Sequence, residues 1–258
     1  MYVYANDMKR ILEDNLRRVR QRIAAACERV RRDPDSVSLV AVTKYVDVDV
    51  IRVLLELGVT DIGENRAQEL VRRATVIGET HEGRGGGGTR WHMIGGLQRN
   101  KVKSLLPHVT LIHSVDRLRL AEEINKRAGE LGLRTDVLLE VNGGNEPQKS
   151  GAAVCAAGHL GEQMASMAHI RLRGLMTMAP FGLDPQSLRN IYARVFEAFD
   201  EMRHDFAVGD AFDTYSAGMT QDFELAVECG ATMVRVGTAL LEGVARRGEA
   251  TASPAGGQ

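Results

Sequence analysis

Apolar residues recur at intervals of three and four near the start of the chain, between about residues 6 and 32. Arginines and acidic residues fill the positions between them, so that one face is apolar and the other is charged. This spacing predicts an amphipathic helix ahead of the first strand. The apolar positions are Met8, Ile11, Leu12, Leu16, Val19, Ile23 and Cys27.

Short apolar runs then alternate with helical patterns along most of the remaining sequence. The first run, residues 38–44, is rich in β-branched residues and bounded by polar ones, which is typical of a buried parallel strand. Seven more strands are predicted at residues 60–64, 90–94, 109–114, 136–141, 170–176, 212–216 and 232–236. Helices are predicted between them at residues 48–57, 65–77, 100–106, 116–131, 151–168, 185–206 and 222–229.

Eight strands interleaved with helices indicate an α/β protein. They favour a single closed (β/α)8 TIM-type barrel, with an extra N-terminal helix, over a doubly wound open sheet. We predict one barrel domain over residues 1–245 and a disordered tail over residues 246–258, which lack an apolar stripe. Residues 78–89 hold a run of glycines and are interpreted as a flexible insertion, because a phosphate-binding P-loop also needs Gly-Lys-Ser/Thr.

Charge and composition narrow the classes of partner. Lys and Arg number 33 against 34 Asp and Glu, a net charge of -1, so the chain offers no field for nucleic acid or an anionic membrane. The start of the chain lacks a signal-peptide pattern, and no apolar run approaches the roughly 18 residues that span a bilayer. Cys27, Cys155 and Cys229 have no metal-binding or disulfide-motif spacing. We therefore expect a cytoplasmic protein with reduced thiols and a small-molecule or protein partner.

Lys44 ends the first predicted strand, and the carboxyl ends of barrel strands are where such folds bind their ligands. A lysine amine that loses its proton on burial attacks an aldehyde to form a Schiff base. The alternative is a structural lysine that extends from the strand end into solvent. This segment alone leaves both interpretations open.

A second group of residues lies at the ends of the last two predicted strands. Ser216 ends one, and Gly237 and Thr238 follow the other, in the two loops that bind phosphate in many barrels. The alternative for the glycine is a tight turn. Arg235 lies two residues before Gly237 and so faces the same side of its strand. It either pairs with an acid such as Glu64 or faces a ligand.

Other polar residues lie at predicted strand ends, and the sequence pattern alone does not assign them a role. His92 and His113 are either hydrogen-bonded core histidines or site residues, and no third ligand at metal spacing accompanies them, so no metal is predicted. The remaining members of this set are Glu64, Asn65, Ser114, Glu140 and Asn142.

Eight motifs in order resemble the pyridoxal-phosphate homeostasis protein family, the YggS-type proteins, whose fold is that of the alanine racemase N-terminal barrel. They are residues 39–44, 62–65 with 68–69, 91–101, 112–116, 141–142 with 149–151, 172–176, 216–220 with 222, and 233–238. The resemblance implies pyridoxal 5′-phosphate as cofactor, joined to Lys44 as a Schiff base with Asn65 beside it. It implies Arg235 at the pyridine nitrogen, and Ser216, Gly237 and Thr238 on the phosphate.

The chain departs from the family pattern in four places. Arg66 replaces an aromatic residue, Gly96 a proline and Ala217 a methionine, and residues 78–89 look inserted. None of these removes a residue named for the cofactor. They affect the rim of the site, and with it the selectivity for partners or ligands.

The resemblance implies a protein of intracellular pyridoxal-phosphate homeostasis, without robust catalytic activity, that buffers its cofactor or delivers it to apo-enzymes. We expect a monomer, because the sequence shows no extra interface element. One alternative is a pyridoxal-phosphate-dependent amino-acid racemase, which needs a second acid opposite the lysine. Tyr45 would point away from Lys44 if the strand continued, and only a short polar tail follows Thr238 where alanine racemases carry a further β-domain. Another alternative is a barrel that binds a different phosphate ester without a Schiff base.

Overall fold

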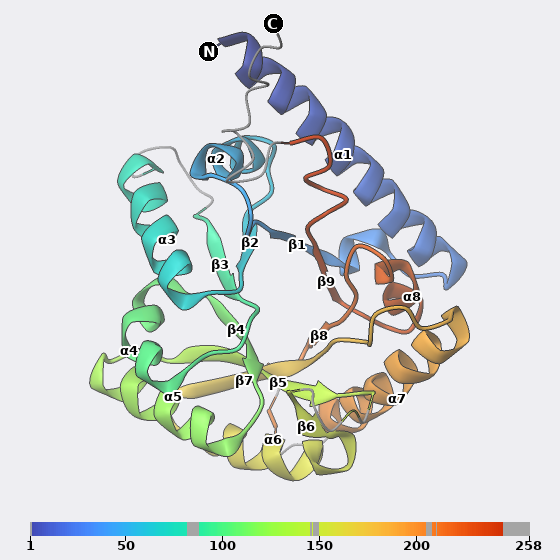
Figure 1. Ribbon diagram of the computed structural model, residues 1–258. Helices are drawn as coiled ribbons and strands as arrows, with labels where there is room; N and C mark the ends of the chain where they lie inside the picture. The colour runs from blue at the N-terminus through green and yellow to red at the C-terminus, as the bar shows by residue number, and fades with distance from the viewer. Residues whose placement is uncertain are drawn as a thin grey trace, which may run out of the picture.

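Eight parallel strands close into a barrel in the computed structural model, which describes residues 2–81, 88–144, 146, 150–204, 208–209 and 211–244 (Figure 1). The barrel strands are β1 Ser38–Val42, β2 Asp61–Glu64, β3 Arg90–Met93, β4 Leu111–Val115, β5 Thr135–Asn142, β7 Ile170–Thr177, β8 Thr214–Ser216 and β9 Met233–Val236. The order β4-β3-β2-β1-β9-β8-β7-β5 closes through pairing of β4 with β5. All eight predicted strands are confirmed. A two-residue strand, β6 Ala152–Ala153, adds to the end of β5 and was not predicted.

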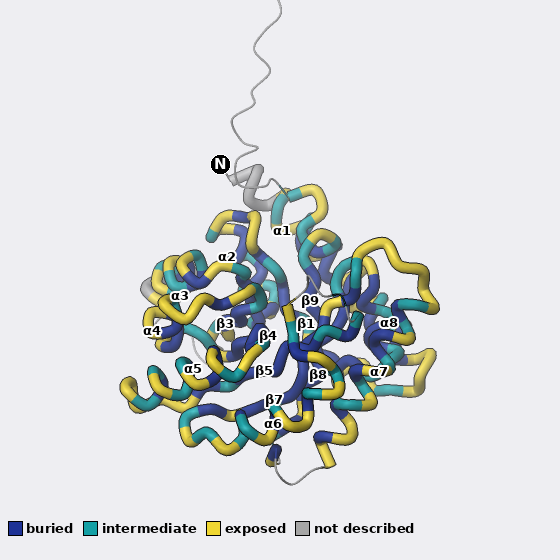
Figure 2. Tube along the Cα trace, turned by 60° about the horizontal axis from the view of Figure 1, so that its bottom comes forward, coloured by how far each residue is buried: buried dark blue, intermediate teal, exposed yellow. Residues whose placement is uncertain are grey.

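The helices cover the outside of the barrel, and each has buried positions on one side and exposed positions on the other (Figure 2). They are α1 Tyr2–Arg29, α2 Val48–Glu56, α3 Ala67–His81, α4 Val102–Leu105, α5 Leu118–Glu130, α6 Ala157–Ala165, α7 Pro185–Arg203 and α8 Phe223–Glu228. None of these described helices is long and apolar enough to cross a membrane.

The N-terminal helix predicted ahead of the first strand is present as α1, and it lies in the ring of helices around the barrel. Helix α1 packs against both α8 and α2, and no helix follows β9 within the described residues. It therefore occupies the place of the eighth barrel helix. Asn15 joins it to the segment after β9 by donating hydrogen bonds to the carbonyls of Leu240 (3.0 Å) and Glu242 (2.8 Å).

Two predicted helices are shorter than expected for local reasons. The helix predicted over residues 151–168 begins at Ala157, because Gly151 has φ +112 and its position lies against the backbone of Asn142. A Cβ there would come within 2.6 Å of the Asn142 nitrogen. Pro107 limits the helix predicted over residues 100–106 to one turn of α4, flanked by 3-10 turns. The predicted tail, residues 246–258, and residues 82–87 of the predicted insertion lie outside the described residues. Residues 78–81 of that insertion form the last turn of α3, so the prediction of a loop is wrong for them.

The inside of the barrel is built in layers. Val40, Leu111, Leu138, Met176 and Met233 form a buried apolar cluster separate from the core between strands and helices. Residues two apart on a strand face the same side. The inward positions one step nearer the carboxyl ends of β4, β5 and β9 are therefore His113, Glu140 and Arg235.

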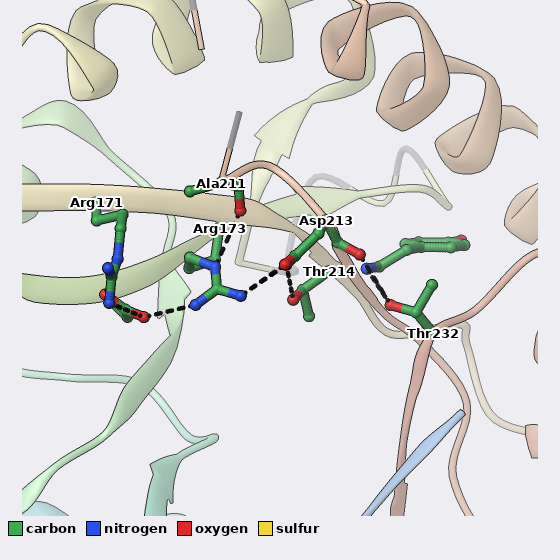
Figure 3. A network of polar contacts seen from close by, with 8 residues as sticks. Arg171, Arg173, Ala211, Asp213, Thr214 and Thr232 are labelled. Carbon is green, nitrogen blue, oxygen red and sulfur yellow. Dashed lines mark hydrogen bonds and ion pairs between the residues drawn. The ribbon is translucent and has the colours of Figure 1, made fainter. Parts of the chain in front are cut away.

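The amino-terminal end of the barrel is held by arginine–aspartate pairs (Figure 3). Arg173 donates to Asp136 at 2.9 Å and to Asp213 at 2.7 Å, and so connects the strand starts of β5, β7 and β8. Arg171 makes a two-pronged pair with Asp136, at 2.6 and 2.8 Å. These charges satisfy one another, which leaves the opposite end of the barrel for ligand chemistry.

Candidate functional site

The residues predicted for a site gather at the carboxyl ends of four neighbouring strands. In the ring the order is β2, β1, β9, β8, and Asn65, Lys44, Gly237 and Ser216 lie at the ends of these strands in that order. Strands that are neighbours in the sheet thus bring together residues that are far apart in the sequence. Lys44 and Thr238, for example, are 194 positions apart. The topology therefore assembles the predicted set at one end of the barrel.

Lys44 lies in a turn directly after β1 and is exposed. The N–H of Val46 donates to the Thr43 carbonyl at 3.1 Å, so the strand does not continue through Lys44. For that reason the expectation that Tyr45 points away from Lys44 is wrong: the Lys44 Nζ lies 4.9 Å from the centre of the Tyr45 ring. The protein does not bury this amine, whereas the expectation from the sequence was that burial removes its proton.

A buried arginine that the sequence analysis did not identify holds this turn. Arg73 of α3 donates to the carbonyls of Thr43 and Val46, each at 2.7 Å, on either side of Lys44. It also pairs with Glu64, and Thr43 Oγ1 donates to the same carboxylate at 2.9 Å. Burial raises the pKa of Glu64 despite the charge of Arg73 beside it.

A sequence signal for Arg73 was present. It stands three residues after Leu70 and four before Ile77, both fully or almost fully buried on α3. An arginine in the apolar stripe of a helix must have internal partners, because its charge is otherwise costly to bury. Its helical spacing with Leu70 and Ile77 therefore indicated that Arg73 is buried and has partners inside the protein.

Arg235 is 3% exposed and lies inside the barrel on β9, as its register with Gly237 predicted. Its Nη1 donates to Ser216 Oγ at 2.5 Å and its Nη2 donates to the Thr177 carbonyl at 2.9 Å. Glu64 is engaged by Arg73, so the alternative of an Arg235–Glu64 salt bridge is wrong. Burial lowers the pKa of Arg235, opposed by the negative charge of surrounding groups that include Asp222 and Glu140.

Ser216 is fully buried, and its hydroxyl contacts a histidine as well as Arg235. His113 Nδ1 lies 3.1 Å from Ser216 Oγ, and His113 Nε2 lies 2.9 Å from Nδ1 of His92. Both histidines are therefore hydrogen-bonded core residues, the first of the two alternatives left open for them, and a role at the ligand stays a prediction. The contact of Ser216 with Arg235 is observed, whereas its role as a phosphate ligand stays a prediction.

The segment after β9 combines backbone N–H groups with a neighbouring hydroxyl. Within the described residues, neither the N–H of Gly237 nor that of Thr238 has a protein acceptor. The Ala239 N–H points to Oγ1 of Thr220, 3.4 Å away in the loop after β8. Thr220 was missed as a site residue, although a hydroxyl two positions after Gly218 was a usable signal. Backbone N–H groups and two threonine hydroxyls are suited to an anion such as a phosphate.

Asn65 lies next to Gly95, and the two segments pack closely. A Cβ at Gly95 would stand 2.4 Å from the Asn65 carbonyl oxygen and 2.8 Å from its Cα. Gly95 therefore permits the end of β2 to approach the end of β3, which fixes the backbone of Asn65 at the mouth of the barrel.

Glu140 is a buried acid in the same interior layer as Arg235. Burial and the nearby carboxylate of Asp116 raise its pKa to about 7, against the opposite pull of Arg235 and Arg117. Its place in the barrel follows from Leu138, two residues earlier, which is part of the interior apolar cluster. The described residues bring together no group of three or more His, Cys, Asp or Glu side chains suited to a metal ion.

Comparison with known proteins adds independent information. The sequence model of the alanine racemase N-terminal domain matches residues 12–243. A pyridoxal phosphate homeostasis protein of Aquifex aeolicus is 39% identical over 227 residues, which cover 88% of this chain and 96% of the relative.

Two solved structures are similar in both fold and sequence. A protein of unknown function from Bifidobacterium adolescentis has a TM-score of 0.87 and 37% identity, covering 91% of this chain and 96% of that one. PipY of Synechococcus elongatus, solved with PLP bound, has a TM-score of 0.72 and 32% identity, covering 84% and 99%.

Proposed function

This chain belongs to the alanine racemase N-terminal domain family and, within it, to the pyridoxal phosphate homeostasis proteins, and from this membership we propose that it binds pyridoxal 5′-phosphate. The observation that carries the proposal is the buried Arg235 guanidinium. It lies in the barrel below a segment with free N–H groups, at the end where Lys44 also lies.

The donor set fits this cofactor. A guanidinium carries five N–H donors, and within the described residues Arg235 uses Nη1 and Nη2 once each in hydrogen bonds. Gly237 and Thr238 offer backbone N–H groups, and Thr238 and Thr220 add hydroxyls, for a phosphate. The family pattern implies Ser216 as a further phosphate ligand, whereas in this structure its hydroxyl contacts Arg235 and His113 instead.

Each residue has a separable task in the proposal. The bound cofactor supplies an aldehyde and an electron-withdrawing pyridine ring. Lys44 provides the amine for a Schiff base with that aldehyde, and Asn65 lies beside the ring. Arg235 stays protonated and therefore keeps the facing ring nitrogen unprotonated, which weakens the ring as an electron sink. This arrangement favours holding the cofactor over carbanion chemistry.

We extend the proposal to physiology in the form the family name gives it. The chain takes part in intracellular pyridoxal-phosphate homeostasis, as a monomer that passes its cofactor to apo-enzymes. Transfer is measured by incubating the loaded protein with an apo-enzyme that depends on the cofactor. Recovery of that enzyme's activity faster than with an equal concentration of free cofactor supports delivery, and equal or slower recovery contradicts it.

The direct test is reduction with borohydride after incubation with pyridoxal 5′-phosphate, followed by peptide mapping. We expect an absorption band of the bound cofactor and a single labelled residue, Lys44. Both disappear in Lys44→Ala and persist in Lys103→Ala, which removes an exposed lysine on α4. Saturable binding without a labelled lysine would favour the alternative of a phosphate-ester site, and a label at another lysine would refute the assignment of Lys44.

Racemisation is the second candidate, because Tyr45 lies against Lys44 instead of pointing away from it. A racemase requires an acid on the face of the substrate opposite its lysine. Incubation of the loaded protein with alanine in deuterated water distinguishes the two functions. Exchange at Cα with inversion would establish racemisation, and absence of exchange supports a binding role.

A further inference from the structure

A line of hydrogen bonds crosses the barrel interior from the start of β2 to the middle of β9. Asp61 Oδ1 lies 2.9 Å from His92 Nε2, His92 Nδ1 lies 2.9 Å from His113 Nε2, and His113 Nδ1 lies 3.1 Å from Ser216 Oγ. Arg235 Nη1 completes it by donating to Ser216 Oγ at 2.5 Å. All five residues are buried, with residue exposures between 0% and 8%.

The chemistry of the two ends, together with the protonation of the two histidines, determines the direction of the bonds. A guanidinium only donates and an ionised carboxylate only accepts. Burial alone would raise the pKa of Asp61, but hydrogen bonds from His92 and Arg90 lower it to about 2, so this end is ionised. The pKa of His113 is well below its usual value because of burial, with His92 and Arg235 nearby.

With neutral histidines, one assignment satisfies all four contacts. Ser216 accepts from Arg235, so its own proton points to Nδ1 of His113. His113 Nε2–H then donates to Nδ1 of His92, and His92 Nε2–H donates to Asp61. The opposite direction needs an additional proton on Asp61 or His92. No member is left with an unpaired donor or acceptor within the line.

We infer that Asp61, His92 and His113 are positioning residues for Arg235, acting through the hydroxyl of Ser216. The three residues orient the Ser216 hydroxyl so that it accepts a hydrogen bond from Arg235 on β9. This bond holds the Nη1 edge of the guanidinium, and the remaining donors of Arg235 then face the mouth of the barrel. A serine hydroxyl without His113 would be free to rotate its proton toward Arg235, which would repel the guanidinium. The consequence for ligand binding rests on the proposed function, because it assumes a ring nitrogen opposite Arg235.

The direction of the line is tested without any ligand, by ¹⁵N NMR of the histidine rings in the wild-type protein near pH 8. We expect the proton on Nε2 and a bare Nδ1 in both rings, as the hydrogen-bond directions require. A proton on Nδ1 of His113, or a charged His113 ring, would overturn the inference. This readout does not depend on whether any variant folds.

The consequence for Arg235 is tested by binding to His113→Phe and His113→Asn. Asparagine keeps an acceptor near Ser216, whereas phenylalanine removes it. We expect His113→Phe to weaken binding of pyridoxal 5′-phosphate about tenfold, with partial recovery in His113→Asn. Binding of an analogue with carbon in place of the ring nitrogen should change less than about twofold, since that analogue makes no bond to Arg235. His159→Phe, at an exposed histidine, serves as control.

The outcomes separate this inference from the proposed function. An equal loss of affinity for both compounds in His113→Phe would mean that His113 only supports the fold, and would overturn the positioning role. A wild-type protein that binds neither compound would refute the proposed function, while the NMR result would still decide the direction of the hydrogen bonds.

Discussion

Single charged residues inside the barrel define the chemistry of its carboxyl end. Arg235 is held by a hydroxyl and a carbonyl, and has no carboxylate within ion-pair distance among the described residues. Glu140 lies in the same layer and interacts with it at longer range. A positive group with unused donors and an acid that titrates near neutral pH are features that mark functional sites more often than packing does.

The protonation of Glu140 makes stability depend on pH. Its pKa rises from 4.5 in an unfolded chain to about 7 in the fold, so the folded state binds the proton more tightly. The stabilisation by the protonated acid is complete below about pH 4.5 and is lost as the pH rises through 7. We expect Glu140→Gln to raise the free energy of unfolding by roughly 2–3 kcal/mol at about pH 8, and to have little effect near pH 4.5.

Urea denaturation at both pH values measures this difference. Glu162→Gln, at an exposed glutamate on α6, provides the matched control and should behave like the wild type at both. A Glu140→Gln effect of equal size at the two pH values would contradict a raised pKa and would instead indicate a change in packing.

At the scale of elements, α3 determines where β1 ends. Arg73 reaches from this helix to the two carbonyls on either side of Lys44 and to the buried Glu64 of β2. Most strand and helix boundaries were predictable to within a few residues from local patterns, because they follow from period and turn residues. The turn that carries Lys44 was not, because a partner 27 to 30 residues away fixes it.

We expect Arg73→Met to lower the free energy of unfolding by about 3–5 kcal/mol, because it leaves the Glu64 carboxylate buried without its partner. Arg72→Met changes the neighbouring exposed arginine of the same helix and should have only a small effect. Chemical denaturation of both variants gives the comparison. Adding Glu64→Gln to Arg73→Met should restore part of the loss, and a double variant less stable than Arg73→Met would argue against an unpaired charge as the cause.

At the scale of the whole molecule, the two ends of the described chain are part of one closed structure. Helix α1 fills the eighth helix position, and Asn15 bonds the segment that follows β9. The barrel therefore lacks its complete outer layer until the first helix has met the last strand. Such a dependence between chain ends favours a single cooperative unfolding transition.

Asn15→Ala tests this connection. Two carbonyls lose their donor, one of them in a buried bond, so we expect the free energy of unfolding to fall by about 1–3 kcal/mol. Far- and near-ultraviolet circular dichroism should still report the same midpoint. Asp14→Ala, at the exposed neighbour, serves as control, and separate midpoints in Asn15→Ala would show that α1 unfolds independently of the barrel.

The sequence by itself determined the eight strands, most of the helices and the inward position of Arg235, because strand and helix periods are local properties of the chain. It also placed Lys44, Gly237 and Thr238 at strand ends. Only the tertiary structure decided that Lys44 is exposed beside Tyr45, that Glu64 belongs to Arg73, and that α1 completes the ring. It also decided the line of hydrogen bonds from Asp61 to Arg235. Such contacts join residues that are distant in the chain. A buried polar group must form hydrogen bonds, and only the closed barrel determines which partners lie within reach.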